Sequence, residues 1–126
     1  MIHLDTDVLI DSLSGALRSA GDLRSAIEQG EQILISTIVL YEWLRGPRQR
    51  QELEVQEALF PRAAAVPFAS EEAALAAELY QRLRRPRGRE IDIAVAACAI
   101  AHGAALWTLN RRDFEDVPGL QLYAPA

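Results

Sequence analysis

Four acidic residues stand at positions where carboxylates could do chemistry instead of covering the surface. Asp5 and Asp113 each follow a short apolar run of the kind that forms a buried strand. Glu42 lies in a long stretch otherwise free of charge, and Asp92 is flanked by isoleucine on both sides. Burying an unpaired carboxylate is costly, so each of these acids needs a partner. Their joint pattern points to a shared site.

A divalent cation is the partner that suits clustered carboxylates best. The chain has 13 basic residues, all of them arginine, and therefore no lysine amine can neutralise the acids. Carboxylates close together raise one another's pKa unless a cation lies among them. Oxygen ligands favour Mg²⁺ or Mn²⁺ over zinc. A metal held in this way could activate water for phosphodiester hydrolysis.

Arginines are concentrated in one segment of an otherwise acidic chain. Residues 82–89 contain five arginines, although the formal net charge of the whole chain is −5. Such a charge run is compatible with a solvated loop. It is equally compatible with a rim that holds nucleic-acid phosphates, for which Arg84, Arg85 and Arg87 are the candidates. The sequence leaves both interpretations open.

Each acid, taken alone, also has a structural explanation. Asp5 or Asp7 could cap the helix that follows, and Asp92 could interact with a helix N-terminus. Glu42 could pair with an arginine three residues later, and Asp113 could be a turn residue. The functional interpretation therefore depends on whether the fold brings the acids together.

Short apolar runs alternate with helical patterns along the whole chain. We expect one domain over residues 1–126, an α/β fold with a short central parallel sheet and helices on both faces. In such folds ligands bind at the carboxyl ends of the strands, where several of the acids lie. The expected strands are Ile2–Leu4, Gln32–Ile35, Ala65–Phe68 (weak), Ala105–Leu109 and, as a possible last strand, Leu120–Tyr123. The expected helices are Val8–Leu13, Ser19–Gln29, Thr37–Arg45 capped by Ser36, Gln51–Phe60, a helix from a capping Ser70 to about Leu83, and Glu90–His102.

Composition excludes several other classes of protein. Without lysine there can be no Walker P-loop and no Schiff-base chemistry. The single cysteine, Cys98, cannot form an intrachain disulfide, which favours a cytoplasmic protein. No apolar run approaches the length of about 20 residues that a membrane-spanning helix needs. We expect no membrane association.

Four segments together resemble the PIN-domain ribonucleases, and within them the VapC toxins of type II toxin–antitoxin systems. The segments are IHLDTDVLID, STIVLYEWLRG, GREIDIAVAACAIAHG and LWTLNRRDF, which cover essentially the whole chain in the order of the family. The first segment alone also resembles haloacid-dehalogenase phosphatases. The short chain, the lack of lysine and the later acidic segments argue against that group.

The resemblance assigns a role to each acid. It implies a catalytic quartet of Asp5, Glu42, Asp92 and Asp113, in which Asp5 and Asp92 bind Mg²⁺ or Mn²⁺ directly. Glu42 and Asp113 would bind through water, complete a second metal position or orient the attacking water. The resemblance makes Thr108 and Asn110 supporting polar residues. Asp7 stands where many members have asparagine or serine, and we treat it as peripheral.

The resemblance also implies the partners. It predicts a structured RNA substrate, such as tRNA or rRNA, and a VapB-like antitoxin that blocks the acids. A homodimer and a toxin–antitoxin hetero-oligomer are expected, with operator DNA contacted only through the antitoxin.

Two alternatives to a ribonuclease remain. The chain could be a catalytically silent PIN fold that binds an antitoxin or nucleic acid, although the presence of all four acids argues against this. It could also be a metal-dependent phosphatase acting on small substrates.

Overall fold

A small parallel sheet organises the chain, and its central strand is the first element. The computed structural model describes all 126 residues. Strand β1 (Ile2–Leu4) pairs with β2 (Ile33–Leu34) on one side and with β3 (Ala105–Trp107) on the other, and both pairs are parallel. The chain therefore leaves β1 toward one edge of the sheet and later returns to the opposite edge. The expected α/β fold is confirmed.

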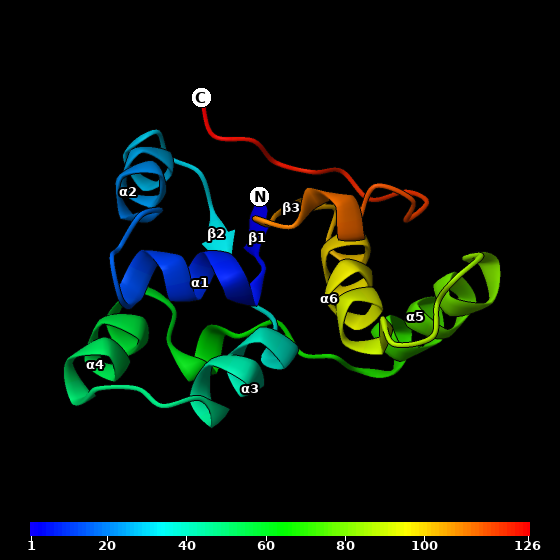
Figure 1. The fold of residues 1–126 in the computed structure, drawn as a ribbon, viewed down its shortest axis with the longest axis horizontal. Coiled ribbons are helices and arrows are strands. Elements are labelled where there is room, and N and C mark those ends of the chain that lie inside the picture. Colours follow the sequence, from blue (N-terminus) through cyan, green and yellow to red (C-terminus); the bar gives the residue numbers. More distant parts are fainter.

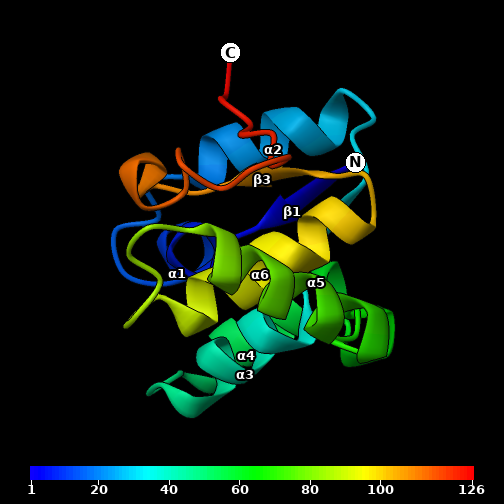
Figure 2. The same cartoon turned by 90° about the vertical axis from the view of Figure 1, so that its right-hand side faces the viewer.

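Helices cover the sheet on both sides. In Figure 1, α1 and α2 lie on one side of the strands, and α6, with α5 packed on its outside, lies on the other. Figure 2 looks onto α5 and α6, with β1 and β3 running past them. None of the helices is both long and apolar enough to cross a membrane. The helices are α1 (Thr6–Leu13), α2 (Ala20–Glu28), α3 (Thr37–Arg45), α4 (Arg50–Leu59), α5 (Ser70–Arg82), α6 (Glu90–Ala101) and the short 3₁₀ helices η1 (Arg62–Ala64) and η2 (Arg111–Asp113).

Side-chain caps fix where two of these helices begin. Asp5 Oδ1 accepts a hydrogen bond of 2.9 Å from the backbone N–H of Thr6, so α1 starts two residues earlier than expected. Ser36 caps α3 as expected, because its Oγ accepts a bond of 3.2 Å from Val39 N. The expected cap at Ser70 is wrong. Ala69 is the N-cap of α5, and its N–H donates to Glu72 Oε1 at 3.0 Å.

Helix α6 runs through the centre of the molecule. All seven residues from Ile93 to Ala99 are buried, as its apolar pattern predicts. Most of them are alanines, which allow close packing of α5 and β3 against this helix. Since Asp92 directly precedes the buried run, the core fixes the position of that carboxylate.

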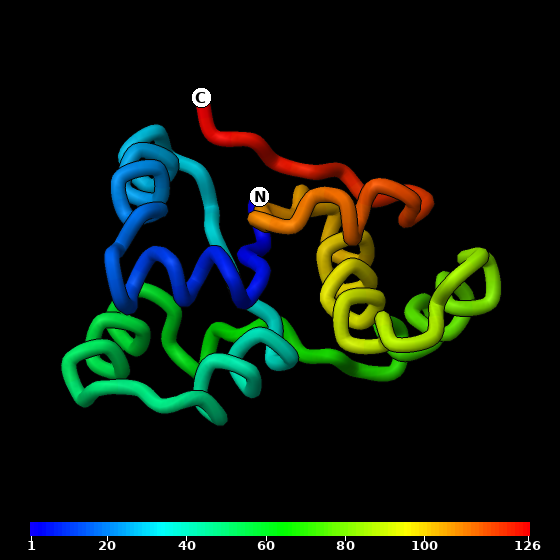
Figure 3. The backbone as a smooth tube through the Cα atoms, in the orientation of Figure 1, coloured from blue at the N-terminus to red at the C-terminus, as the bar shows by residue number.

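Two expected strands reduce to single bridges. Ala65–Phe68 pairs only through Val66, which bridges Ser36, and Leu120–Tyr123 pairs only through Leu122, which bridges Leu106. The expected strand Ala105–Leu109 ends at Trp107. In Figure 3 the C-terminal segment, drawn in red, turns back and passes β3 on its way to the C-terminus. These segments extend the sheet at its edges without forming regular ladders.

Candidate active site

The carboxyl ends of β1 and β3 meet at the centre of the proposed site. Asp5 directly follows β1, and Thr108 directly follows β3. The Thr108 hydroxyl donates to Asp5 Oδ2 at 2.7 Å, while Asp5 Oδ1 caps α1. The strand order reverses between β1 and β3, which is where open α/β sheets form ligand crevices. Two residues separated by most of the chain are thus joined at the point that the fold favours for binding.

Asp5 is a buried carboxylate with little to offset its charge. The residue is almost enclosed, with a relative exposure of 7%. Burial, followed by the charge of Asp7, raises the pKa of Asp5 to about 7, and the hydrogen bonds from Thr108 and Thr6 oppose this rise only partly. The buried position therefore disfavours the charged form of Asp5. Carboxylates with raised pKa values are common at functional sites.

Asp7 is bound more firmly than a peripheral residue would be. Its carboxylate accepts hydrogen bonds from Leu109 N at 3.2 Å and from Asn110 Nδ2 at 2.7 Å. Burial raises its pKa, and these bonds counteract the rise. Asp7 thus fixes the segment after β3 to the first turn of α1. Asn110 acts on Asp7 and not on Asp5 itself.

Glu42 reaches the same end of the sheet from α3. Its Oε1 accepts a bond of 2.6 Å from the hydroxyl of Thr6, the residue next to Asp5. Its Oε2 lies 3.4 Å from Arg45, so the ion pair within α3 that the sequence allowed is also present. The carboxylate is largely covered, with a side-chain exposure of 18%. Both contacts together orient Glu42 toward the start of α1.

Asp92 and Asp113 complete the group of acids. Asp92 is half-buried in the first turn of α6, and Asp113 is exposed at the end of η2. Burial raises the pKa of Asp92, and the charges of Asp113, Glu42 and Asp7 raise it further. The neighbouring Arg89 lowers it. Asp92 therefore lies within electrostatic range of the other three acids, Asp5, Glu42 and Asp113.

The donor set fits a hard divalent cation. It consists of carboxylates and neighbouring hydroxyl oxygens, and the carboxylates raise one another's pKa where no positive charge balances them. No group of three or more His, Cys, Asp or Glu side chains lies in an arrangement that could enclose a metal. Mg²⁺ commonly binds through one or two carboxylates and keeps several waters, so it does not require a set of side chains that encloses it.

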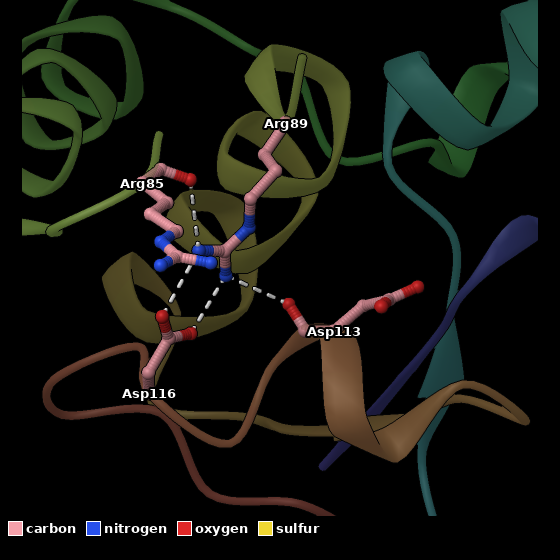
Figure 4. Close-up of polar contacts among 4 residues, drawn as sticks. All are labelled: Arg85, Arg89, Asp113 and Asp116. Atoms are coloured by element: carbon pink, nitrogen blue, oxygen red, sulfur yellow. Dashed lines mark hydrogen bonds and ion pairs between the residues drawn. The ribbon is translucent and has the colours of Figure 1, made fainter. Parts of the chain in front are cut away.

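A two-pronged ion pair links two segments that carry acids. Arg89, the N-cap of α6, donates to Asp116 Oδ1 at 2.6 Å and to Asp116 Oδ2 at 2.9 Å. It also donates to the carbonyl of Asp113 at 2.9 Å. Figure 4 shows the Asp113 carboxylate extending away from this pair. Arg89 therefore holds the backbone of Asp113 while leaving its carboxylate free.

Comparison with known proteins establishes the family. The model of the PIN domain matches residues 2–120. The chain belongs to the PIN-domain family. Ribonuclease VapC19 of Mycobacterium tuberculosis is 35% identical over 120 residues, which cover 94% of this chain and 95% of the relative. The VapC-type PIN domain expected from the four motifs is thereby confirmed.

Solved structures share the fold of this PIN domain over nearly its full length. VapBC from Salmonella typhimurium, solved bound to DNA, has a TM-score of 0.81 at 22% identity and covers 97% of this chain and 96% of that one. VapBC2 from Rickettsia felis, solved with a DNA fragment from its promoter, has a TM-score of 0.77 at 24% identity and 98% coverage of both chains. A toxin–antitoxin complex from Klebsiella pneumoniae has a TM-score of 0.74 at 27% identity and covers 100% of this chain and 98% of that one.

An open polar pocket adjoins the acids of this PIN domain on the side of Asp113. Its volume is about 590 Å³, and no hydrophobic side chain lines it. The lining includes Arg84 and Arg85 from the arginine run, whereas Arg87 lies outside it. The complete lining is Arg84, Arg85, Arg89, Arg112, Asp113 and Asp116.

Sequence reasoning missed the roles of several polar residues around the acids, although it named Thr108 and Asn110. Thr6 binds Glu42, Arg89 binds Asp116, and Arg112 joins the arginines of the pocket. Thr6 and Arg112 each stand directly beside a candidate acid, and Arg89 belongs to the arginine run 82–89; these are the signals that the sequence offered. Nothing in the spacing marked Asp116, because its partner lies 27 positions away.

Proposed function

We propose that this chain, acting as one PIN domain over residues 1–126, is a metal-dependent endoribonuclease toxin. The observation that carries the proposal is the gathering of Asp5, Glu42, Asp92 and Asp113 at the carboxyl end of the sheet beside an arginine-lined pocket. In the reaction, water is added across a phosphodiester bond of RNA. One product ends in a phosphate and the other in a hydroxyl group. A structured RNA of the tRNA or rRNA class is the proposed substrate.

The side chains divide the work. Asp5 and Asp92 would hold Mg²⁺ or Mn²⁺ directly, and Glu42 and Asp113 would contribute through water. When bound, the cation supplies activation of water and offsets the charge that develops on the phosphate. Thr108 keeps Asp5 oriented through its 2.7 Å hydrogen bond, and Thr6 does the same for Glu42 at 2.6 Å. The oriented carboxylate of Glu42 is suited to accept a proton from the attacking water.

A VapB-like antitoxin is the proposed partner. The similar structures from Salmonella typhimurium and Rickettsia felis are VapBC complexes solved with DNA. By analogy, an antitoxin would cover the acids of this chain, and operator DNA would be contacted only through the antitoxin. We also propose a homodimer of the chain within a toxin–antitoxin hetero-oligomer, acting in the cytoplasm.

Cleavage of RNA by the isolated chain tests the enzyme. The purified protein, free of antitoxin, is incubated with total RNA in Mg²⁺ or Mn²⁺, with and without EDTA, and the new ends are mapped by sequencing. Asp5→Asn removes the central acid, and Asp22→Asn is the matched control because Asp22 is exposed on α2. We expect discrete, EDTA-sensitive cuts by the wild type and Asp22→Asn and none by Asp5→Asn.

Other outcomes would contradict the proposal. Full activity of Asp5→Asn would show that the acidic group does not take part in the reaction. Absence of cuts with either metal, from a folded protein and a broad RNA pool, would favour a catalytically silent binding module. Expression in cells separates these cases further. Growth arrest relieved by Asp5→Asn supports the enzyme, whereas identical effects of both forms support binding alone.

A further inference from the structure

The pocket beside Asp113 carries positive charge that the fold does not use. The side chains of Arg84, Arg85 and Arg112 are exposed, and none of the three forms an ion pair or a side-chain hydrogen bond within the chain. A solvated surface could hold such residues one at a time. Here three of them line one cavity of about 590 Å³ that contains no apolar side chain. Their convergence needs an explanation other than folding.

The fourth arginine of the pocket has a different task. Both carboxylate oxygens of Asp116 accept hydrogen bonds from Arg89, which also binds the carbonyls of Arg85 and Asp113 (Figure 4). The charge of Arg89 is therefore balanced, and its donors are engaged. The three free arginines and Asp113 leave the pocket with a formal charge of +2 in a protein whose net charge is −5. Positive charge is thus concentrated beside Asp113, at the edge of the acidic group.

We propose that Arg84, Arg85 and Arg112 form a subsite for a backbone phosphate of the RNA, next to the phosphate that is cleaved. The guanidinium group suits this task, since its planar donors match phosphate oxygens and it keeps its charge throughout the physiological pH range. Asp113 lies in the wall of the pocket and belongs to the acidic group, so one RNA strand passing Asp113 would reach both sites. The subsite rests on the proposed function, because it assumes that RNA is the substrate.

The subsite divides the arginine run into two parts. Arg84 and Arg85 bind phosphate together with Arg112, which is remote in sequence and comes from η2. Arg87 is exposed but outside the pocket, so it serves as a control from the same loop. Contacts to phosphate carry no base information, and the subsite therefore positions the strand without selecting its sequence.

Salt-dependent binding tests the subsite without requiring cleavage. The probe is a short fluorescein-labelled single-stranded RNA of mixed sequence, and fluorescence anisotropy is measured in EDTA over a range of NaCl concentrations. Binding to the triple variant Arg84→Gln, Arg85→Gln, Arg112→Gln should weaken about tenfold or more at low salt. The slope of log K against log[NaCl] should fall by about 0.7 for each phosphate that the variant no longer neutralises. Arg87→Gln should keep the wild-type affinity and slope.

Two further arms identify the ligand and exclude misfolding. The triple variant with lysine at the same positions keeps the charges and should keep the wild-type slope. A fall in slope as large with lysine as with glutamine would overturn the proposal. A labelled oligo-glutamate peptide represents an acidic protein partner. If the glutamine variant lost affinity only for this peptide and not for RNA, the pocket would be a protein-docking site and the proposal would be wrong.

Failure of the subsite and failure of the enzyme are distinguishable. RNA cleavage that persists while the salt slopes of the wild type and the triple glutamine variant are equal would overturn the subsite alone. RNA binding that depends on the three arginines, in a protein that cuts no RNA, would support the subsite and contradict the nuclease.

Discussion

Arg89 and Asp116 form a two-pronged ion pair, with N–O distances of 2.6 and 2.9 Å, that ties the start of α6 to the segment after β3. The partnership raises the pKa of Arg89 and lowers that of Asp116. Asp92 lies three residues beyond Arg89, and Asp113 lies three residues before Asp116. One ion pair therefore fixes the separation between two candidate catalytic acids from different elements.

We expect Arg89→Gln and Asp116→Asn to reduce the rate of cleavage far more than they reduce stability. The pair is partly exposed, at 21% and 54% of the two side chains, so its contribution to folding is only about 0.2–1 kcal/mol. Misplacing a catalytic group by about 1 Å can cost up to about 100-fold in rate. Single-turnover cleavage and thermal unfolding measure the two effects separately.

The double variant of Arg89 and Asp116 provides the control. Arg89 also binds the carbonyl of Asp113, so Arg89→Gln should cost at least as much activity as Asp116→Asn, and the double variant should lose little more than Arg89→Gln alone. RNA affinity should change little, since Arg89 is engaged within the protein. A loss of affinity equal to the loss in rate would instead place Arg89 among the residues that contact RNA.

Asp5→Asn should stabilise the metal-free protein at neutral pH. The pKa of Asp5 rises from 3.8 to about 7 in the fold, so between these pH values the folded protein holds a proton that the unfolded chain has released. The free energy of unfolding therefore falls as the pH rises through this window, by up to about 4 kcal/mol. Asparagine does not titrate, so the variant should lose this dependence. Urea unfolding in EDTA at several pH values measures it.

The exposed acid Asp22 is the control for this experiment. Asp22→Asn should keep the wild-type pH dependence, because Asp22 is on the surface of α2. In Asp5→Asn the free energy of unfolding should still fall as the pH rises, but less steeply, because the pKa values of Asp7 and Asp92 are also raised. If the free energy of unfolding depended on pH equally in the wild type and Asp5→Asn, burial would not raise the pKa of Asp5, and the prediction would be wrong.

Thr108→Val should impair both the site and the fold. Valine has nearly the same shape as threonine but removes the hydroxyl that donates to Asp5 Oδ2 at 2.7 Å and accepts from Asn110 N at 3.1 Å. Leaving a buried polar group without its partner costs about 1–3 kcal/mol. The pKa of Asp5 should rise further, because its hydrogen bond from Thr108 lowers it. Thr108→Ser keeps the hydroxyl and should retain most stability and activity, as melting and cleavage assays would show.

Divalent cations should raise the melting temperature of the wild type near neutral pH. A ligand at 100 times its Kd stabilises the folded state by about 2.7 kcal/mol. Asp92→Asn should abolish the increase, because it removes a proposed direct ligand. The exposed-acid variant Asp22→Asn should respond as the wild type does. An equal increase in the melting temperature of Asp92→Asn would show that the cation binds elsewhere on the chain.

The sequence predicted most of the regular elements well, because they depend on local apolar pattern. The apolar runs predicted β1 and α6. Asp92 became a candidate because it is an acid between two isoleucines. The edge segments 65–68 and 120–123 were overestimated, since an apolar run does not reveal whether a neighbouring strand is long enough to pair with it. Single bridges result where the partner strand is short.

The resemblance implied Thr108 and Asn110 as supporting residues, but local pattern could not predict their contacts, because these join residues that are far apart in the chain. The bond from Thr108 to Asp5 spans 103 positions, and the bond from Thr6 to Glu42 spans 36. Asp7 was treated as peripheral because many family members have asparagine or serine at its position, and its sequence neighbours do not reveal the contacts with Leu109 and Asn110. Only the order of strands in the sheet brings these partners together.

The position of β1 between β2 and β3 has a consequence for the timing of activity during synthesis. Asp5 is synthesised before its partner Thr108, and 103 positions separate the two residues. The central strand cannot be enclosed on its second side until β3 is available to pair with it. The acids are thus brought into register only after β3 and Thr108 have been synthesised. We therefore expect a nascent chain to lack the assembled site until that segment has left the ribosome.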